Sequence, residues 1–422
     1  MVERLISFSG IFVLLGIAWL MSNNRKKIHF RTVWVGISLQ LIFAVFILKT
    51  RVGLMVFDFS RVVITKLLDF TDYGSVFLFG NLYRATPDIV KGLGSSGPYQ
   101  LMNSATGRFV NIGTIFAIHV LPTIIFFASI MSILYHLGIM QKFVAAMAWV
   151  ISRAMKVSGA ESLSAASNIF VGQTEAPLVI KPYISDMTMS ELMAVMVGGF
   201  ATVAGGIMAA YVRFGIDPGN LMAASVMSAP ASLVMAKIIY PETKTPKTAE
   251  TVKVFIEKKT ENVIDAAAQG AAEGLKLALN VGAMLLAFIA IIAMINFGLG
   301  FLHTSLKEIF GYIFMPISFF MGVPTKDLVE FGNLLGTKIS VNEFVAYVEL
   351  GAIKDQLSPR TVIIATYALC GFANFSSIAI QIGGIGGIAP NRRSDLAKLG
   401  MRAMFGGALA SWLTATIAGM II

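Results

Sequence analysis

The chain has 422 residues, of which 56% are apolar and only 13% carry a formal charge, with a net charge of +10. A soluble globular protein has about twice that charged fraction, and here the apolar residues come in uncharged runs too long for buried strands. A lipid bilayer is therefore the expected solvent. The single cysteine, Cys370, excludes a disulfide framework and a Cys-based zinc site. In a membrane protein the basic excess is typical of cytoplasmic loops, and it does not indicate nucleic-acid binding.

Uncharged stretches predict eight transmembrane helices. They lie at 5–24, 32–48, 109–141, 192–212, 218–236, 277–306, 361–391 and 403–422. A further stretch, 309–325, is short and has Pro316 at its middle, so an interfacial helix is expected there. Two more interfacial helices are expected, one at 139–157 and one where polar residues recur every three or four positions: Asp58, Arg61, Thr65, Asp69 and Asp72.

Basic clusters set the expected orientation of these spans. They follow the first and third spans and precede the eighth, and with eight spans all three clusters fall on one face. Because cytoplasmic loops carry the excess of Lys and Arg, this face is predicted to be cytoplasmic and both termini to lie outside. The polar stretch 241–273 is then a cytoplasmic connector between two halves.

Two segments carry polar residues where lipid should be. The first, 161–186, reaches Gly-Gln-Thr-Glu at 172–175 after a small-residue half-span and then turns apolar again. The second, 327–356, carries Gly336, Asn342 and Glu343 between two short apolar arms. Irregular backbone at membrane depth is tolerated only where it lines a cavity in the protein, so both segments are predicted to be re-entrant hairpins.

Each hairpin is followed by a span that starts with a helix-capping signal. Thr188 and Glu191 form a T-x-x-E capping box, and Ser358 precedes Pro359 at a first helical position.

These two spans also share an interruption, Gly-Phe-Ala-Thr at 199–202 and Gly-Phe-Ala-Asn at 371–374. The last residue of each tetrad lies 27 and 31 residues after the acid of its hairpin, which indicates a duplicated unit of hairpin, broken span and plain span.

The two copies start on opposite faces of the membrane, so the repeat is inverted. Inverted repeats with interrupted helices are typical of secondary transporters, whose sites lie where the copies meet. Neither a phosphate-binding loop nor a nucleophile elbow is present to support an ATP-driven pump or a membrane enzyme. A membrane enzyme using two carboxylates and a channel or receptor are the remaining alternatives.

Long motifs in both copies resemble the concentrative nucleoside transporters in their shorter bacterial form. They are SNIFVGQTEAPLV, NEFVAY, CGFANFSSIAI and NVIDAAAQGAAEGLKLALNVGAML. The resemblance covers nearly the whole chain. It implies a homotrimer in the bacterial cytoplasmic membrane that is not an enzyme and needs no cofactor. Each protomer would import a nucleoside such as uridine, cytidine or adenosine together with a cation, by an elevator movement of the hairpin-bearing unit.

The resemblance also assigns the substrate site residue by residue. A nucleobase edge needs directional donors and acceptors, and the residues implied are Gln173, Thr174 and Glu175. The ribose hydroxyls would bond to Glu343, Asn374 and Ser377. Apolar contact with base and sugar is expected from Phe372 and Ile207.

Structural roles are the alternatives for these residues. Glu175 could pair with Lys181, and Glu343 could pair with Lys338. The polar side chains of the first hairpin could satisfy the hairpin's own backbone, and those of the second broken span could join helices. Phe372 could serve packing alone.

For the coupling ion, the resemblance implies sodium between the first hairpin and its broken span. The implied ligands are Asn168 and Thr202, with the backbone carbonyls of Val171 and Val203. Neutral oxygens suit a hard monovalent cation. Asn168 and Thr202 have no titratable group, and proton coupling through Glu175 or Glu343 is the alternative.

The chain is accordingly divided into four parts. Two are expected to be scaffold: 1–158, with the first three spans, and 241–326, with the connector, the sixth span and an interfacial helix. The other two, 159–240 and 327–422, are the expected transport repeats.

Overall fold

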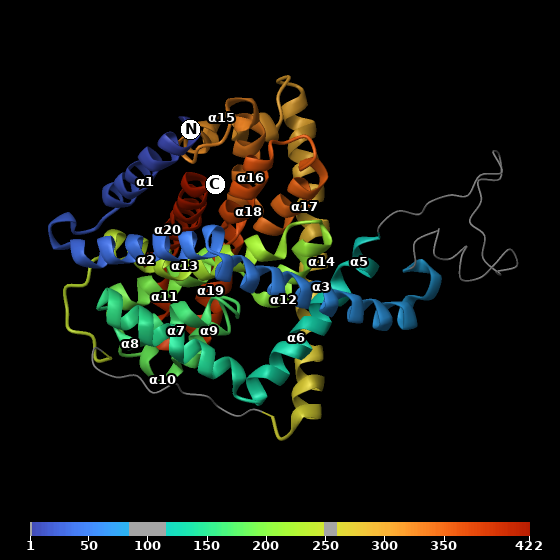
Figure 1. Cartoon of the computed structure of the whole chain (residues 1–422), viewed down its shortest axis with the longest axis horizontal. Coiled ribbons are helices and arrows are strands. Elements are labelled where there is room, and N and C mark those ends of the chain that lie inside the picture. Colours follow the sequence, from blue (N-terminus) through green and yellow to red (C-terminus); the bar gives the residue numbers. More distant parts are fainter. Residues whose placement is uncertain (1, 84–114, 249–259) are drawn as a thin grey trace, which may run out of the picture.

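A computed structural model describes residues 2–83, 115–248 and 260–422. Within these ranges the chain forms helices joined by turns and has no β-strand (Figure 1). Helices pair their backbone groups internally, as a lipid environment requires. The prediction of an all-α membrane protein is confirmed.

Within the described ranges, seven helical stretches are long and apolar enough to cross a bilayer. They are α1 (Val2–Leu20), α2 (Phe30–Lys49), Phe116–His136, Met189–Arg213, α13 (Pro218–Ile239), α14 (Val263–Gly300) and Pro390–Ile421. The third comprises α5 (Phe116–His119) and α6 (Leu121–His136), and the last contains α20 (Arg393–Ile421). The expected start of the third span, at 109, lies outside the described residues, as does part of the connector.

The predicted span 361–391 is divided in two, α18 (Pro359–Leu369) and α19 (Phe375–Ile388). The span at 192–212 is likewise divided, into α11 (Met189–Ala201) and α12 (Gly205–Arg213). Both divisions fall at the tetrads, so the expected interruptions are present. The total of eight spans stays a prediction.

The two interruptions lie against each other inside the molecule. The backbone N–H of Phe372 donates to the carbonyl of Thr202 over 3.3 Å. Gly371 has φ +151°, and a Cβ there would lie 2.7 Å from the carbonyl oxygen of Phe200. Glycine is therefore required where the two broken helices meet.

Both segments expected to be hairpins have helical arms on either side of non-helical residues, and their re-entrant position in a membrane stays a prediction. The first consists of α8 (Gly159–Ser167), a non-helical tip and the short helices α9 (Ala176–Val179) and α10 (Lys181–Ile184). The second consists of α16 (Leu328–Ser340) and α17 (Glu343–Ile353). Gly336 lies within α16 and not at the tip. A Cβ there would be 2.2 Å from Cβ of Phe310 on α15 (Leu306–Phe320), so the glycine serves close helix packing.

The helix caps are partly as expected. The side chain of Thr188 accepts from the N–H of Glu191 over 3.0 Å, and the carboxylate of Glu191 accepts in return, so this capping box is confirmed. The Ser358 side chain makes no cap bond. Asp327, at the start of the second hairpin, instead accepts the N–H of Ser358 and the hydroxyl of Thr361, because its carboxylate reaches the start of α18.

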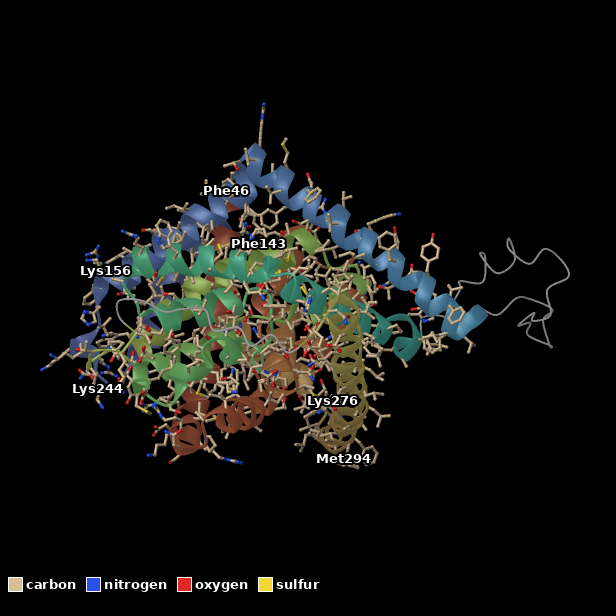
Figure 2. The ribbon with its side chains drawn as sticks, turned by 90° about the horizontal axis from the view of Figure 1, so that it is seen from below. Phe46, Phe143, Lys156, Lys244, Lys276 and Met294 are labelled. Carbon is tan, nitrogen blue, oxygen red and sulfur yellow. The ribbon has the colours of Figure 1, made fainter. Side chains whose placement is uncertain are left out.

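Three amphipathic helices match the expected interfacial segments: α3 (Arg51–Phe79), α7 (Ile139–Met155) and α15. On α3, Arg61 pairs with Asp217 over 2.7 Å, and Asp72 pairs with Arg213, so this helix is fastened to the turn between α12 and α13. On α7, Phe143 is 60% exposed, on a helix whose opposite face is buried (Figure 2).

The core sits around α11, α13 and α20, against which α1 and α2 also pack. By contrast, α14 contacts mainly α6 and exposes most of its length. The helices α14 and α6 pack closely because α14 has glycines at the contact. A Cβ on Gly270 would lie 2.6 Å from Cβ of Ser132, and a Cβ on Gly274 would lie 2.8 Å from Cβ of Ala128.

Candidate functional site

The tip of the first hairpin lies beside the interruption of its own broken span. The N–H of Gly205, which opens α12, donates to the carbonyl of Phe170 over 3.1 Å. Thr202 ends α11, and its hydroxyl donates to the carbonyl of Gly198 over 3.0 Å.

Asn168 caps α8 at this junction and is 1% exposed. Its amide nitrogen donates to the carbonyl of Ser164, while Oδ1 is buried without a hydrogen-bond partner. Val171 lies in the same tip and Val203 in the interruption, and both lie outside the helices. A buried oxygen without a donor fits a small cation, because leaving such an atom unpaired costs about 1–3 kcal/mol. The described residues contain no cluster of His, Cys, Asp and Glu for a transition metal.

The second hairpin places a carboxylate at the interruption of the other broken span. Glu343 opens α17 and is 4% exposed. It accepts the hydroxyl of Tyr211, on α12, and the amide of Asn374, each over 3.1 Å. Asn374 is fixed in turn because its Oδ1 caps α19 at the N–H of Ser377.

Hydrogen bonds connect the two hairpins through α19. The amide of Gln173 donates to the hydroxyl of Ser377 over 3.1 Å. Gln381, one turn further along α19, donates to Oε1 of Gln173 and to the carbonyl of Met196 on α11. Polar side chains from both repeats therefore form one buried, continuous set at the crossing of the broken helices.

Thr174 and Glu175 follow Gln173 at the tip of the first hairpin and have other neighbours. Thr174 packs on α19 at Gly384, where a Cβ would be 3.0 Å from the Thr174 methyl. Glu175 is exposed to a cavity of about 380 Å³ between the hairpin, α12, α6 and α14. Small-molecule sites have volumes of this order. The cavity extends past Lys181 to Glu273, near the first turns of α14.

The apolar residues expected at the substrate are both buried near these groups. Ile207 lies one turn before Tyr211 on α12, and Phe372 lies two residues before Asn374. They are 6% and 8% exposed.

Lys338 does not pair with Glu343, contrary to one of the alternatives. It is fully buried, and its ammonium donates to the carbonyl of Ala368 and the hydroxyl of Ser411, each over 2.7 Å. The carbonyl is one that the end of α18 leaves unpaired, so the lysine satisfies a helix terminus. The carboxylate of Glu343 keeps its neutral donors.

Tyr211 and Gln381 were not expected in the site. Tyr211 is four residues after Ile207 and Gln381 four residues after Ser377, so each shares a helix face with a residue that was expected. This spacing is the signal that could have identified them.

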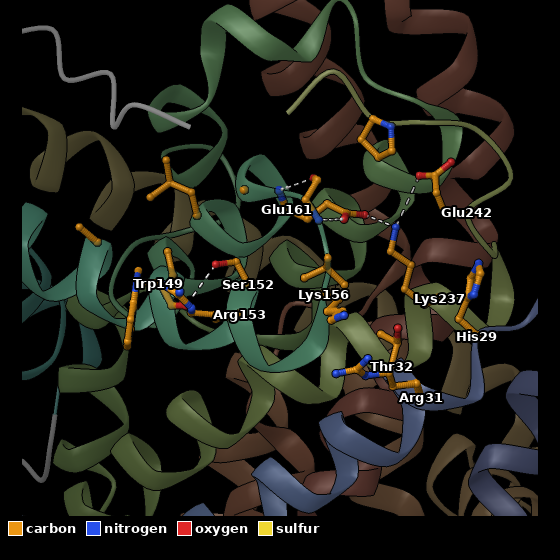
Figure 3. A pocket seen from close by; sticks show the side chains of 17 residues that line it. His29, Arg31, Thr32, Trp149, Ser152, Arg153, Lys156, Glu161, Lys237 and Glu242 are labelled. Atoms are coloured by element: carbon orange, nitrogen blue, oxygen red, sulfur yellow. Dashed lines mark hydrogen bonds and ion pairs between the residues drawn. The ribbon is translucent and has the colours of Figure 1, made fainter. Parts of the chain in front are cut away.

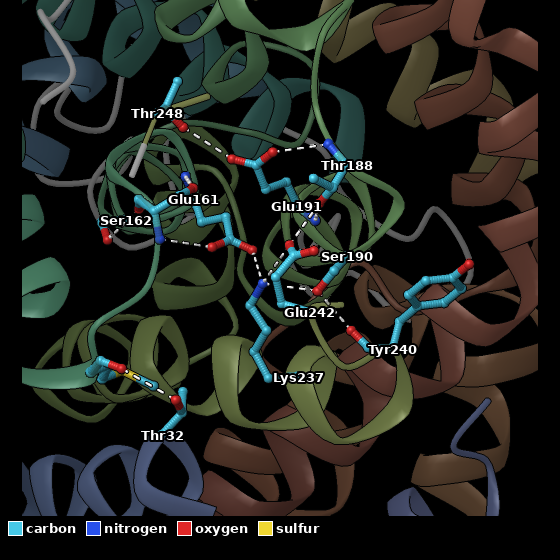
Figure 4. Close-up of polar contacts among 12 residues, drawn as sticks. Thr32, Glu161, Ser162, Thr188, Ser190, Glu191, Lys237, Tyr240, Glu242 and Thr248 are labelled. Carbon is cyan, nitrogen blue, oxygen red and sulfur yellow. Dashed lines mark hydrogen bonds and ion pairs between the residues drawn. The ribbon is translucent and has the colours of Figure 1, made fainter. Parts of the chain in front are cut away.

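The base of the first hairpin is held by a buried ionic network (Figure 4). Lys237, on α13, pairs with Glu161 of α8 and donates to Ser190 of α11 over 2.9 Å. Glu242 accepts from Thr188 and lies 3.7 Å from the same ammonium. The hairpin is thereby fastened to α11 and α13.

Comparison with known proteins agrees with this arrangement. Family models match with the descriptions "Na+ dependent nucleoside transporter" N-terminus over 9–82 and C-terminus over 220–419, and "Nucleoside recognition" over 117–218. The Bacillus subtilis transporter YutK is 43% identical, with 98% of each chain covered. Mouse sodium/nucleoside cotransporter 1 is 39% identical over 99% of this chain and 64% of its own length.

Solved structures of the transporter CNTnw have the same fold. Its inward-facing substrate-bound state has a TM-score of 0.89 and 41% identity, covering 99% of this chain and 98% of that chain. An outward-facing state of a CNTnw variant has a TM-score of 0.90 and 40% identity, with the same coverage. The expected resemblance is confirmed, and the chain belongs to the sodium-dependent nucleoside transporter family, which is a family of transporters and not of enzymes.

Proposed function

We propose that the protein imports nucleosides across the bacterial cytoplasmic membrane by sodium-coupled symport. One observation carries this proposal: the hydrogen-bonded set of both hairpins lies at the crossing of the broken helices, beside the unpartnered Oδ1 of Asn168. Secondary transporters bind substrate and ion at such crossings.

In this proposal the nucleoside replaces hydrogen bonds that the side chains now make with each other. The carboxylate of Glu343 accepts hydrogen bonds from the ribose hydroxyls. Asn374 and Ser377 also form hydrogen bonds with these hydroxyls. Hydrogen bonds to a charged carboxylate are stronger than those between neutral groups. Gln173, Thr174 and Glu175 read the base edge, and Phe372 and Ile207 cover its apolar faces. Glu175 lines the cavity of about 380 Å³, and in this proposal the base leaves its site past Glu175 through that cavity, toward the first turns of α14.

Sodium binds Oδ1 of Asn168, Thr202 and the carbonyls of Val171 and Val203. The ion would order the hairpin tip that carries Gln173, and thus raise nucleoside affinity. By linkage, nucleoside raises sodium affinity by the same factor.

Movement follows an elevator scheme in a homotrimer. The pair α6 and α14, with interfacial helices, stays in place while the two repeats cross the membrane as a unit. The ion pairs of α3 with Arg213 and Asp217 must then break during the movement. The close glycine contact of α6 with α14 and the buried network at Lys237 support two separately rigid bodies. Positive loop charge supports both termini lying outside.

Equilibrium binding of labelled uridine to the purified protein tests the coupling. The dissociation constant should fall at least about tenfold between sodium-free buffer and saturating sodium. A dissociation constant that is the same with and without sodium, and that falls on acidification, would indicate that the coupling ion is a proton and not sodium.

A further inference from the structure

A second, larger cavity lies away from the substrate site. It has a volume of about 1020 Å³ and is bounded by the first turn of α2, the last turns of α7, the start of α8 and the end of α13 (Figure 3). The basic loops that follow α1 and α7 lie on the same face. By the proposed orientation this is the cytoplasmic boundary of the bilayer.

The lining of this cavity is positively charged. It contains the cationic side chains of Arg31, Arg153, Lys156 and Lys237 against two carboxylates, Glu161 and Glu242, which gives a net charge of +2.

Both carboxylates lie beside Lys237, and among the described residues no carboxylate lies within 4 Å of the other three cations. The first turn of α2, where His29 makes no side-chain cap bond, borders the same cavity. A phosphate group matches these donors.

Apolar surface adjoins the charged lining. Trp149 is 61% exposed, with the guanidinium of Arg153 5.4 Å from its ring centre. On α2, Phe30 and Trp34 are 66% and 58% exposed on the turns next to Arg31. Tryptophan beside arginine is typical of the membrane interface, where rings lie at the level of the lipid headgroups. The occupant therefore needs both an anionic group and an apolar tail.

We propose that this cavity binds the headgroup of an anionic phospholipid of the cytoplasmic leaflet. Basic pockets between membrane helices are known to take such headgroups. The bound lipid contacts α2, α7 and the start of α8, where Ser158 lines the cavity. The lipid thereby connects the interfacial helix α7 to the base of the first hairpin.

The test compares two triple variants of the purified full-length protein in detergent. One is Arg31→Gln, Arg153→Gln and Lys156→Gln. The matched control, Lys26→Gln, Lys27→Gln and Lys142→Gln, removes the same charge from exposed positions outside the cavity. Native mass spectrometry measures retained phosphatidylglycerol and phosphatidylcholine.

The wild type and the control should bind phosphatidylglycerol at least about tenfold more tightly than phosphatidylcholine, and the cavity variant should lose this preference. Equal binding of both lipids by the wild type, or an equal loss in the control, would overturn the proposal. Displacement of the lipid by millimolar inorganic phosphate would show a site for free anions instead. Uridine binding, measured on the same samples, separates this result from a failure of the proposed transport function.

Discussion

Asn374 and Glu343 share a hydrogen bond of 3.1 Å, although they belong to different helices and lie 31 residues apart in the chain. The bond joins the tip of the second hairpin to the interruption of the following span. With Tyr211 on the opposite oxygen, the carboxylate is held by two donors from both repeats. In the proposed function, this oriented carboxylate accepts from a sugar hydroxyl.

Glu343→Gln should therefore reduce uridine uptake by at least about a hundredfold, because the amide offers one acceptor and loses the charge-assisted bonds. The thermal unfolding temperature should change little, since removing a buried charge offsets the loss of one hydrogen-bond acceptor. Glu349→Gln is the matched control on the same hairpin, where the carboxylate accepts from Asn333 and Thr337. Equal uptake by the Glu343 variant and this control would contradict the assignment.

Thr202→Val should raise the sodium concentration needed for half-maximal uptake at least about tenfold, because the isosteric side chain has no oxygen for the ion. Thr202→Ser keeps the oxygen and should behave like the wild type. The measurement is uptake against sodium concentration at fixed uridine. An unchanged sodium dependence in the valine variant would exclude the Thr202 hydroxyl from the ion site.

Lys237→Met leaves Glu161 buried without its cation, which should destabilise the protein by about 3–5 kcal/mol. Adding Glu161→Gln to this variant should restore most of the loss, because the carboxylate that remains beside position 237, Glu242, is partly exposed and keeps its hydrogen bond from Thr188. Thermal denaturation of the purified variants measures both effects. If the double variant is no more stable than the single one, the network does not act through this pair.

Gly371→Ala should disrupt the contact between the broken helices, since its Cβ would lie 2.7 Å from the Phe200 carbonyl oxygen at a φ that alanine rarely adopts. Gly383→Ala is the control: nothing lies within 4 Å of its added Cβ, and the substitution should stabilise α19 by about 0.5–1 kcal/mol. Uridine binding and thermal stability should both fall in the first variant only. Wild-type values at Gly371→Ala would show that the crossing tolerates a side chain.

Much of the fold was predictable because its signals are local. The tetrads at 199–202 and 371–374 predicted both interruptions, and Thr188 with Glu191 predicted a capping box that the structure contains. Ser358 and Pro359 also start α18 as expected, but the Ser358 side chain makes no cap bond. Asp327 accepts there instead, and it is distant in sequence, so only the folded hairpin brings it to this helix start.

The same limit applies to the site. The residues at the hairpin tips follow from the resemblance, but their partners depend on how the two repeats pack. Gln381 bonds to Gln173 across 208 residues, and Lys338 reaches Ser411 and not the nearby Glu343. Long-range pairings of this kind require the packed helices and have no signature in a single segment.

Uptake of labelled uridine into proteoliposomes tests the central claim most directly. One set has an inward sodium gradient and the other has potassium in its place, with the purified protein in both. Sodium-coupled symport predicts that uridine accumulates above its outside concentration only in the sodium set and is recovered unmodified. Equal uptake in both sets, increased by external acid, would contradict sodium coupling and indicate that a proton drives the transport.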